Sequence, residues 1–505
     1  METVGHLLYG FQVAFQPLTL FACFIGVLIG TLVGVLPGLG PVAAISLLLP
    51  VTFHAPPVAS VVMLAGIYYG AMYGGSTTSI LVNLPGEAAS VVTCIDGYQM
   101  ARKGRAGVAL GISAFGSFIA GTVGVIGLSF LAPPLAAMAL RFGPPEYFAV
   151  MVLGLSILIF LAGGSMIKSL MMACLGLIIG NIGLDMITAQ PRFTFQMDIL
   201  LDGVGLVPLV MGLFGISEVF LNVEESLTTR KVFETNLKGL FPSLRDWKDS
   251  IWPILRGSVL GFFLGILPGG GAVISSFVSY GMERKLSKHP EEFGKGAIAG
   301  VAGPEAANNS ATAGAFIPLL TLGLPSNAVM AILLGALMIF DTPPGPRLVS
   351  LHPDIFWGVI SSMYLGNAML LVLNLPLIGL WVKILKIPYP ILFPLILLFC
   401  LIGVYSLNNK TSEIGLMLIF GVLGYLMKKF KFDGAPLILA MVLGPLMDKS
   451  LRQALLMSGG SPQIFFESSI CLTLFSTVAV VLFALPLLPV IGRFRKKVGE
   501  AEEQL

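Results

Sequence analysis

Two polar stretches interrupt very apolar sequence and supply oxygen and nitrogen atoms that could bind a small ligand. The first is Gly74-Gly75-Ser76-Thr77-Thr78-Ser79, and the second is Asn308-Asn309-Ser310-Ala311-Thr312. Leu-Pro follows each of them, at Leu84-Pro85 and at Leu324-Pro325. Ser and Thr alone can bond back to their own helix. Two adjacent asparagines are harder to explain by packing, because each amide needs several hydrogen-bond partners in hydrocarbon.

A helix that unwinds at these stretches would present hydroxyl, amide and carbonyl oxygens to one space. Such ligands suit a hard cation such as Na⁺, and the N-termini of half-helices suit a carboxylate. The residues expected to bind substrate here are Ser76, Thr77, Thr78, Asn308 and Asn309, with Asn83, Ser326 and Asn327 at the Leu-Pro breaks. The residues expected to bind a cation are Gly75, Ser79, Glu305, Ser310 and Thr312. Glu87 is a further candidate beside the first break.

Glu305 is the acidic exception in this region, three residues before Asn308. An intramembrane carboxylate is costly and indicates function, so Glu305 could bind Na⁺ or carry a proton. The alternative is a carboxylate near the cytoplasmic end of its helix that water reaches. Residues 1–101, 257–280 and 296–340 contain no Lys or Arg. An anionic substrate in these segments would therefore be neutralised by helix ends, backbone amides and a co-bound cation.

A glycine-proline pattern occurs twice in the chain. Gly26-x3-Gly30-x3-Gly34-x-Leu36-Pro37-Gly38-x-Gly40 is repeated 231 residues later, from Gly257 to Gly271. The Gly-x3-Gly part predicts close helix packing. Proline and glycine at the end stop the helix, and such backbone is tolerated at membrane depth only where protein or a water-filled cavity satisfies it. We expect hairpin tips that line the substrate site, with a purely structural turn as the alternative: Pro37, Gly38, Gly40, Gly269, Gly270 and Gly271.

The composition predicts an all-α polytopic membrane protein. The chain has 505 residues, of which 56% are hydrophobic and 11% charged, whereas soluble domains average about 25% charged residues. Two repeats are expected, each a re-entrant-type hairpin followed by a broken helix and further spanning helices. The expected divisions are an N-terminal segment 1–14, a first repeat 15–222, a cytoplasmic linker 223–250, a second repeat 251–455, an extra helix 456–492 and a cytoplasmic tail 493–505. No catalytic residue, cofactor or nucleic-acid partner is expected.

Basic residues predict that the two repeats are inverted. Loop 50–57 has no Lys or Arg, whereas its equivalent 281–296 has four. The next loop in the first half carries Arg102, Lys103 and Arg105, whereas its equivalent carries only Arg347. Because cytoplasmic loops collect Lys and Arg, equivalent loops lie on opposite sides. A threading with about eleven crossings and two hairpins places the N-terminus in the periplasm and the C-terminus in the cytoplasm.

These motifs resemble the large permease subunit of the tripartite tricarboxylate transporters, the TctA family. The resemblance rests on residues 34–41, 69–80, 83–87, 96–101, 267–271, 303–312 and 322–327, and it spans nearly the whole chain. It implies a multi-pass secondary transporter of the bacterial inner membrane, driven by an ion gradient of Na⁺ or H⁺. It also implies a small membrane subunit and a periplasmic solute-binding protein as partners, and citrate or another carboxylate as substrate.

Two other classes of function stay open. An ion or small-solute channel predicts a continuous polar pore, whereas the polar residues here concentrate at two breaks. An intramembrane enzyme would need a catalytic set within the membrane, and the sequence has no His-Glu-x-x-His or Gly-x-Ser-x-Gly. The leading prediction is import of a tricarboxylate or related carboxylate together with a cation.

Overall fold

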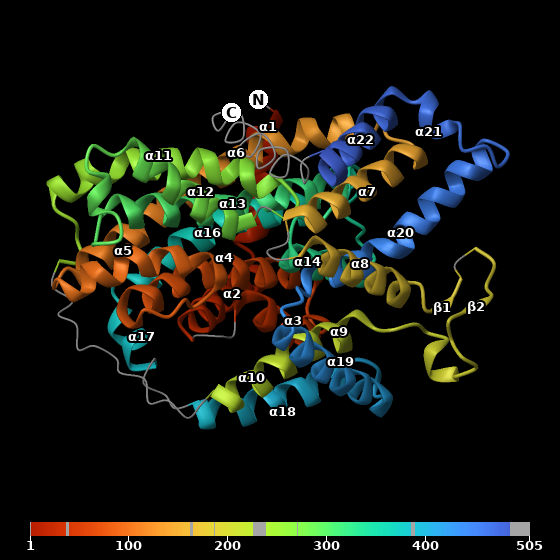
Figure 1. Cartoon of the computed structure of the whole chain (residues 1–505), viewed down its shortest axis with the longest axis horizontal. Helices are drawn as coiled ribbons and strands as arrows, with labels where there is room; N and C mark the ends of the chain where they lie inside the picture. The colour runs from red at the N-terminus through yellow and green to blue at the C-terminus, as the bar shows by residue number, and fades with distance from the viewer. Residues whose placement is uncertain are drawn as a thin grey trace, which may run out of the picture.

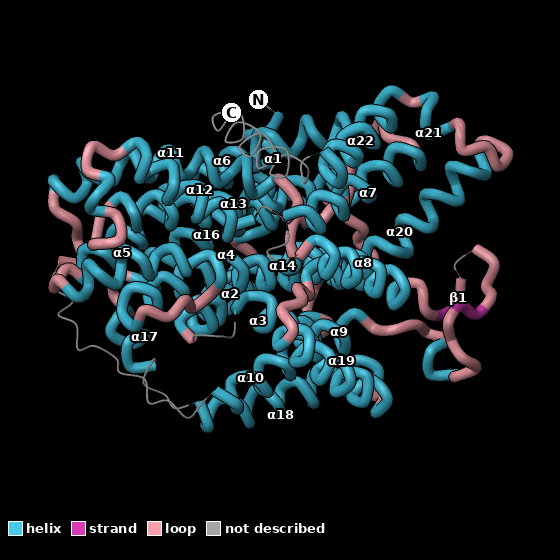
Figure 2. Tube along the Cα trace, in the orientation of Figure 1, coloured by secondary structure: helices cyan, strands magenta, loops and turns pink. Residues whose placement is uncertain are grey.

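Helices dominate the structure of this chain. The computed structural model describes residues 2–36, 40–161, 165–185, 187–225, 239–269, 271–384 and 389–484. Within them one small sheet is formed, in which β1 (Gly183–Leu184) pairs antiparallel with β2 (Pro191–Arg192) (Figure 2). The predicted all-α class is therefore confirmed. Parts of the predicted linker and the whole predicted tail, residues 226–238 and 485–505, lie outside the described residues.

The first half of the chain holds ten described α-helices and three other helical turns. They are α1 (Glu2–Ala14), α2 (Pro17–Val35), α3 (Gly40–Thr52), α4 (Pro57–Val82), η1 (Ala88–Ser90), α5 (Val91–Arg102), α6 (Ala106–Ala139), α7 (Pro144–Leu161), α8 (Met166–Gly180), η2 (Asp198–Leu200), α9 (Leu206–Val210), η3 (Met211–Ile216) and α10 (Ser217–Glu225).

The second half of the described chain is also helical. It comprises α11 (Leu244–Ile266), α12 (Gly271–Leu286), η4 (Pro290–Glu292), α13 (Ala299–Leu322), α14 (Ala328–Ile339), α15 (Leu348–Leu351), α16 (Pro353–Asn374), α17 (Ile378–Ile384), α18 (Tyr389–Asn408), α19 (Thr411–Lys429), α20 (Ala435–Met457), α21 (Ile464–Glu467), α22 (Ser469–Ala479) and η5 (Val480–Ala484).

Five of the described helices are long and apolar enough to cross a membrane by length and composition. They are α2, α4, α6, α16 and α19. Shorter apolar helices, among them α3, α8 and α14, accompany them. This pattern is that of a multi-pass helical membrane protein. The number of crossings stays a prediction.

The helices form two groups joined by α3 and α14. In Figure 1, α2, α4, α6, α11, α12 and α13 run along the long axis of the molecule, while α9, α10, α18 and α19 gather at its lower edge. Between the groups, α3 packs against α18 and η3, and α14 packs against α20. The first group carries both hairpins and both polar stretches.

The Gly-x3-Gly spacing brings two pairs of helices into close contact, as predicted. A Cβ atom added to Gly26 or Gly30 of α2 would overlap backbone carbonyl groups of α4. A Cβ atom added to Gly257 or Gly261 of α11 would overlap carbonyl groups of α13 in the same way. The missing side chains thus let α2 lie against α4 and α11 against α13, and they fix the position of the polar stretches.

Both polar stretches are helical, so the expectation that the helix unwinds there is wrong. α4 runs unbroken through residues 74–79, and α13 runs unbroken through residues 308–312. Hydroxyls bond back to their own helix, for example Thr312 Oγ1 to Asn309 O at 2.6 Å. The breaks come later, before Pro85 and Pro325, because proline lacks an N–H group and disfavours helical backbone in the residue before it.

The hairpin tips are glycine-rich backbone between helical arms. Pro37, Gly38 and Gly270 lie outside the described residues. Gly40, Gly269 and Gly271 have φ values of +58°, +77° and +39°. These left-handed backbone conformations favour glycine. This explains why glycine is the first residue of α3 and of α12, and why it also occurs just before α12.

An ion pair between a partly exposed arginine and a buried glutamate joins the two arms of the second hairpin. Arg256 on α11 donates from Nε to Glu283 Oε1 at 2.9 Å and from Nη2 to Glu283 Oε2 at 2.5 Å. The Glu283 side chain is 2% exposed. A two-pronged arginine–carboxylate contact of this kind fixes the relative orientation of α11 and α12.

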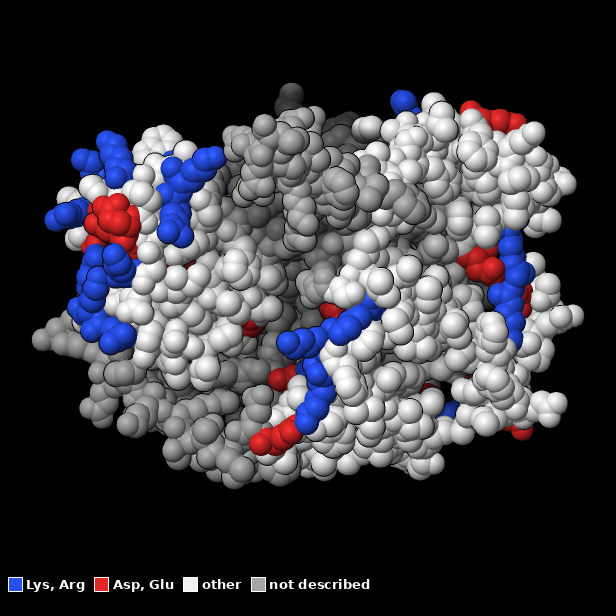
Figure 3. Space-filling view, in the orientation of Figure 1, with Lys and Arg blue, Asp and Glu red and all other residues white. Residues whose placement is uncertain are grey.

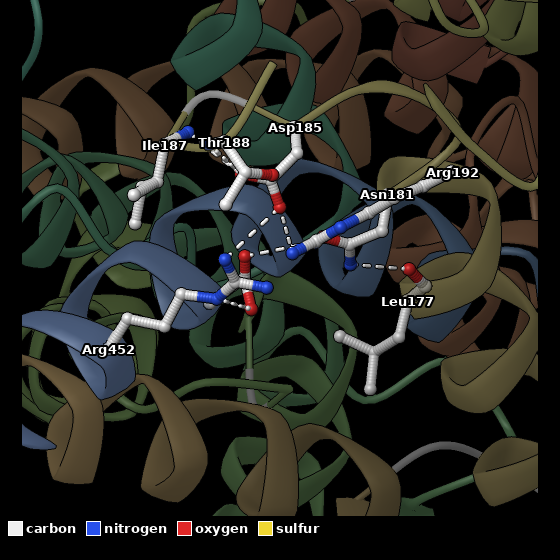
Figure 4. A network of polar contacts seen from close by, with 8 residues as sticks. Leu177, Asn181, Asp185, Ile187, Thr188, Arg192 and Arg452 are labelled. Carbon is white, nitrogen blue, oxygen red and sulfur yellow. Dashed lines mark hydrogen bonds and ion pairs between the residues drawn. The ribbon is translucent and has the colours of Figure 1, made fainter. Parts of the chain in front are cut away.

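Charged side chains form separate groups on the face of the molecule shown in Figure 3. Lys and Arg gather where α5 ends and where α11 and α12 meet their connecting loops, at the left of Figure 3. The opposite end carries the β1–β2 hairpin, which ion pairs hold against α20 (Figure 4).

The ion pairs of the β1–β2 hairpin centre on Asp185. Arg192 contacts both Asp185 and Asp448, and Arg452 Nη1 lies 3.1 Å from Asp185 Oδ2. Hydrogen bonds from the Thr188 amide, together with Arg192, lower the pKa of Asp185 to about 2. The hairpin is thereby anchored by a carboxylate that stays ionised at neutral pH.

Candidate functional site

A fully buried carboxylate lies where four helices of the first group meet. Ser76 Oγ on α4 donates a hydrogen bond to Glu305 Oε2 at 2.5 Å, and Thr93 Oγ1 on α5 donates to Glu305 Oε1. The Ser113 hydroxyl on α6 lies within hydrogen-bonding range of the same group. Glu305 is 0% exposed, and no Lys or Arg among the described residues pairs with it.

The absence of a basic partner decides what Glu305 can do. A buried ionised carboxylate is strongly unfavourable unless an opposite charge compensates it. Hydroxyl donors orient its oxygens but bring no charge. The group therefore requires a bound cation or a proton, which makes it suited to the ion-coupling role predicted from the sequence.

The two adjacent asparagines extend this polar cluster along α13. Asn309 Nδ2 donates to Ser117 Oγ on α6 at 2.8 Å and to Asn308 Oδ1 at 2.6 Å. Asn308 Nδ2 makes no hydrogen bond within the described part of the chain. Both side chains are buried, at 0% and 2% exposed. Asn309 is thus held by its neighbours, while the Asn308 side chain lies close to the Glu305 carboxylate.

Buried polar atoms without a partner concentrate at the predicted site residues. Five of the eleven such atoms in the described residues belong to the polar stretches or to the Leu-Pro breaks. They are Ser79 Oγ, Glu87 Oε1, Asn308 Nδ2, Ser310 Oγ and Ser326 Oγ. Native structures leave few buried polar groups unpaired, because each one costs about 1–3 kcal/mol. A ligand that satisfies these atoms would remove that cost.

The second hairpin tip meets the second helix break. The Gly269 amide donates to Ser326 O at 2.7 Å. The next residue, Asn327, caps α14 by accepting from the Met330 amide at 3.0 Å, and its Nδ2 atom donates to Tyr68 OH on α4 at 3.1 Å. Hydrogen bonds from backbone and side-chain amides therefore link the second hairpin tip to the second helix break, and the break to α4.

The first helix break is built around Glu87. Its Oε2 atom accepts from the Ala89 amide at 2.7 Å and so caps the turn that leads into α5. A Cβ atom added to Gly75 would lie 2.8 Å from Glu87 Cγ, so this glycine makes room for the Glu87 side chain. The η1 turn packs against α12. The starts of α5, α12 and α14 thus approach one region, and helix N-termini carry partial positive charge there.

Other predicted residues lie at separate points of the bundle. Asn83 is exposed and ends α4 with a φ of +58°, a helix-terminal role that asparagine tolerates. The Thr78 hydroxyl bonds to Val35 O on α2 at 2.6 Å. Ser310 faces Gly124 on α6, and Thr312 lines a small cavity elsewhere on α13. The structure therefore distributes the predicted cation ligands over more than one face of α13.

Asp96 is a buried residue for which the sequence gave no role. Its Oδ1 atom accepts from the amides of Gly294, Gly296 and Ala297 at 2.9, 2.6 and 2.9 Å. Its Oδ2 atom accepts from Tyr280 OH at 2.9 Å. Asp96 thus ties α5 to the loop before α13. Thr93 and Ser113 also went unpredicted, because isolated Ser and Thr in apolar helices give no distinguishing signal.

A sizeable cavity lies away from the polar cluster. It has a volume of about 800 Å³, and its mostly apolar walls come from α3, α9, α14 and α20, with Lys449, His54 and Glu413 among the lining residues. A multiply charged carboxylate would lose hydration there with few groups to replace it. Polar atoms without a hydrogen-bond partner occur instead in the polar stretches and at the Leu-Pro breaks.

No group of three His, Cys, Asp or Glu side chains that could hold a metal ion occurs in the described ranges. Any cation held here would have neutral oxygen ligands and at most one or two carboxylates. Such a donor set suits a hard monovalent cation rather than a transition metal.

Comparisons with known proteins give one family and two relatives. The model of the "Tripartite tricarboxylate transporter TctA family" matches residues 20–439. An uncharacterized 52.8 kDa protein in the TAR-I ttuC′ 3′ region of Agrobacterium vitis is 50% identical over 503 residues, which cover 100% of both chains. An uncharacterized protein in the TAR-II ttuC′ 3′ region of the same organism is 49% identical over 238 residues, or 47% of this chain and 98% of that protein. No solved structure matches.

Proposed function

The chain belongs to the Tripartite tricarboxylate transporter TctA family, and from this premise we propose that it imports a tricarboxylate or related carboxylate, such as citrate, together with a cation. In this proposal it is the large membrane subunit of a secondary transporter. Its partners are a small membrane subunit and a periplasmic solute-binding protein. It lies in the bacterial inner membrane with its N-terminus in the periplasm and its C-terminus in the cytoplasm.

The observation that carries the proposal is the Glu305 cluster. A buried carboxylate with three hydroxyl neighbours and no basic partner among the described residues needs a cation or a proton. The free-energy cost of burying the Glu305 carboxylate is lower when that ion is bound and higher when it has left. This gives the protein a means to couple an ion gradient to movement of a charged substrate.

The substrate carboxylates bind near the hairpin tips and the Leu-Pro breaks. Helix starts, the Asn308 amide and the Gly269–Ser326 contact supply polar groups there without any Lys or Arg. The backbone can approach a ligand closely because the tips are glycine. A co-bound cation near Glu305 offsets part of the negative charge of the substrate.

The two halves act as inverted repeats that alternate access to the site. Equivalent helices pair in the same way in both halves, α2 with α4 and α11 with α13. The arm α3 of the first hairpin packs against α18 and η3, and the helix α14, which follows the break in the second half, packs against α20. The equivalent elements, α12 and α5, pack mainly within their own group. This asymmetry supports two states of the protein that differ in which of the two hairpins contacts α18, η3 and α20.

Reconstituted transport tests this function. The chain, the small subunit and the solute-binding protein are placed in proteoliposomes, and uptake of radiolabelled citrate is measured with and without a sodium gradient. We expect accumulation that requires the binding protein and an ion gradient. Flux that needs neither component and never exceeds equilibrium would support a channel. Recovery of chemically altered citrate would support an enzyme.

A further inference from the structure

A small polar cavity adjoins the Glu305 cluster, and two of its lining residues, Ser76 and Thr77, belong to the predicted substrate site. Its walls come from Tyr73, Ser76, Thr77, Leu110, Ser113, Ala114, Asn374 and Ile378. Its volume is about 10 Å³, which is about the space that one water molecule or one small ion requires. Four helices, α4, α6, α16 and α17, contribute to it.

The cavity contains a polar atom that the protein leaves unsatisfied. Asn374 is 5% exposed. Its Nδ2 atom donates to Leu370 O one turn earlier at 2.9 Å, while its Oδ1 atom has no hydrogen-bond partner within the described residues. The amide is therefore oriented with its donor end on the helix and its acceptor oxygen left for another ligand. A buried carbonyl oxygen in this situation calls for a donor or a cation.

On the other walls of the cavity, the side chains of Ser76 and Ser113 lie next to the carboxylate of Glu305. Ser76 Oγ donates its proton to Glu305 Oε2 at 2.5 Å, and the Ser113 hydroxyl lies in range of the same carboxylate. A hydroxyl that donates to a carboxylate directs its lone pairs away from it. The two serine oxygens can therefore act as acceptors toward the cavity, with the carboxylate behind them.

We propose that this cavity binds one Na⁺ ion, coordinated by the oxygens of Ser76, Ser113 and Asn374, with Glu305 as the countercharge behind the two hydroxyls. The inference rests on the proposed ion coupling and gives that coupling a location and two ligands, Ser113 and Asn374, outside the predicted set. Neutral oxygen ligands and a single nearby carboxylate match the preference of a hard cation. They also explain why Glu305 needs no basic partner.

The cavity lies between helices from the two halves of the chain. α4 belongs to the first half of the chain, whereas α16, which carries Asn374, belongs to the second half. An ion bound between them stabilises their contact, and its loss leaves Glu305 without a countercharge. Ion binding is thereby coupled to the packing of α4 against α16.

Sodium binding to the purified full-length chain tests the inference. Binding is measured with radiolabelled Na⁺ and by the shift of Tm in NaCl relative to choline chloride at equal ionic strength. Asn374→Ala should raise the half-saturating Na⁺ concentration about tenfold, because it removes one ligand oxygen. Asn374→Asp should restore binding, since it supplies an oxygen at the same place.

Asn181→Ala provides a matched control. Asn181 Nδ2 bonds to Leu177 O four residues earlier at 2.8 Å, just as Asn374 Nδ2 bonds to Leu370 O, but Asn181 directly follows α8 and lies outside the cavity. This variant should keep the Na⁺ affinity of the wild type. A loss of Na⁺ affinity in both variants would show a general effect of removing a helix-bonded asparagine and would refute the assignment.

The outcomes separate this inference from the proposed function. Sodium binding that is unchanged in Asn374→Ala and Ser113→Ala would place the ion elsewhere, while ion-coupled transport could still hold. A wild-type chain that binds no Na⁺ would mean that the cavity holds water, and would overturn the site. Normal Na⁺ binding to this cavity without any citrate uptake by the reconstituted complex would overturn the proposed function alone.

Discussion

Ser76 Oγ on α4 lies 2.5 Å from Glu305 Oε2 on α13, although 229 residues separate the two positions in sequence. The contact joins the polar stretch of one half of the chain to the carboxylate of the other. It forms because Gly-x3-Gly contacts hold each polar helix against its partner in the same half, and because α5 and α6 fill the space between the halves.

Replacing the carboxylate should uncouple transport from the cation. We expect Glu305→Gln to lower Na⁺-driven citrate uptake about tenfold or more, because a neutral amide cannot act as countercharge. Uptake is measured in proteoliposomes at several Na⁺ concentrations. Glu467→Gln, a change of an exposed carboxylate on α21, serves as the control and should transport normally. Unaltered Na⁺ dependence in Glu305→Gln would exclude this residue from coupling.

The topology predicts opposite labelling of two loops. In a chain without native cysteines, His54→Cys and Lys288→Cys place thiols on exposed positions of equivalent loops. We expect an impermeant thiol reagent to reach position 54 from the periplasm and position 288 only after the membrane is opened. Labelling of both positions from the same side would rule out inverted repeats.

Because α11 lies in close contact with α13, we expect that adding a single methyl group to a glycine at this contact destabilises the protein. Gly261→Ala places a Cβ atom into the carbonyl of Ala307 and should destabilise the protein by about 1–3 kcal/mol. Gly154→Ala on α7 adds the same atom where nothing lies within 4 Å. That variant should be neutral or slightly stabilising in thermal unfolding. Equal Tm values for both variants would contradict the packing argument.

Asp96 should control the opening of the loop before α13. In Asp96→Ala the amides of Gly294, Gly296 and Ala297 lose their carboxylate acceptor. Their hydrogen exchange should accelerate by roughly 10- to 100-fold, as loss of a charged hydrogen bond implies. Asp96→Asn keeps one acceptor oxygen and should give an intermediate rate. Unchanged protection in the alanine variant would show that other contacts hold the loop.

Acid should release the β1–β2 hairpin. The pKa of Asp185 is about 2 in the folded chain because the Thr188 amide and Arg192 favour the ionised form, whereas an unfolded Asp titrates near about 3.9. The stabilisation is therefore complete above the unfolded value and is lost as the pH falls toward 2. Pepsin should spare loop 187–203 at pH about 4.5 and cut it near pH about 2.

The matching variant Asp185→Asn tests the cause of that acid sensitivity. Without the carboxylate, Arg192 and Arg452 lose their shared partner. Pepsin should then cut the loop at both pH values. Cleavage of the wild type and the variant with the same pH profile would assign the effect to a different group.

The sequence by itself determined the helical membrane class, the close helix pairs and the places where helices stop. Hydrophobic composition, Gly-x3-Gly spacing and Leu-Pro dipeptides act locally, through solvent, side-chain size and the missing amide of proline. For that reason Gly30, Gly261, Pro85 and Pro325 could be interpreted without any knowledge of the fold. The same residues place the polar stretches and Glu305 at the centre of the helix group.

Only the tertiary structure decided which polar groups meet and which backbone stays helical. The stretches around Ser76 and Asn309 keep their helices, because packing and back-bonded hydroxyls stabilise them against unwinding. The hydroxyls of Thr93 and Ser113 and the amide of Asn374 reach the Glu305 region from helices distant in sequence. Their residue types are ordinary in apolar helices, so their role follows from burial, orientation and distance, which no local pattern encodes.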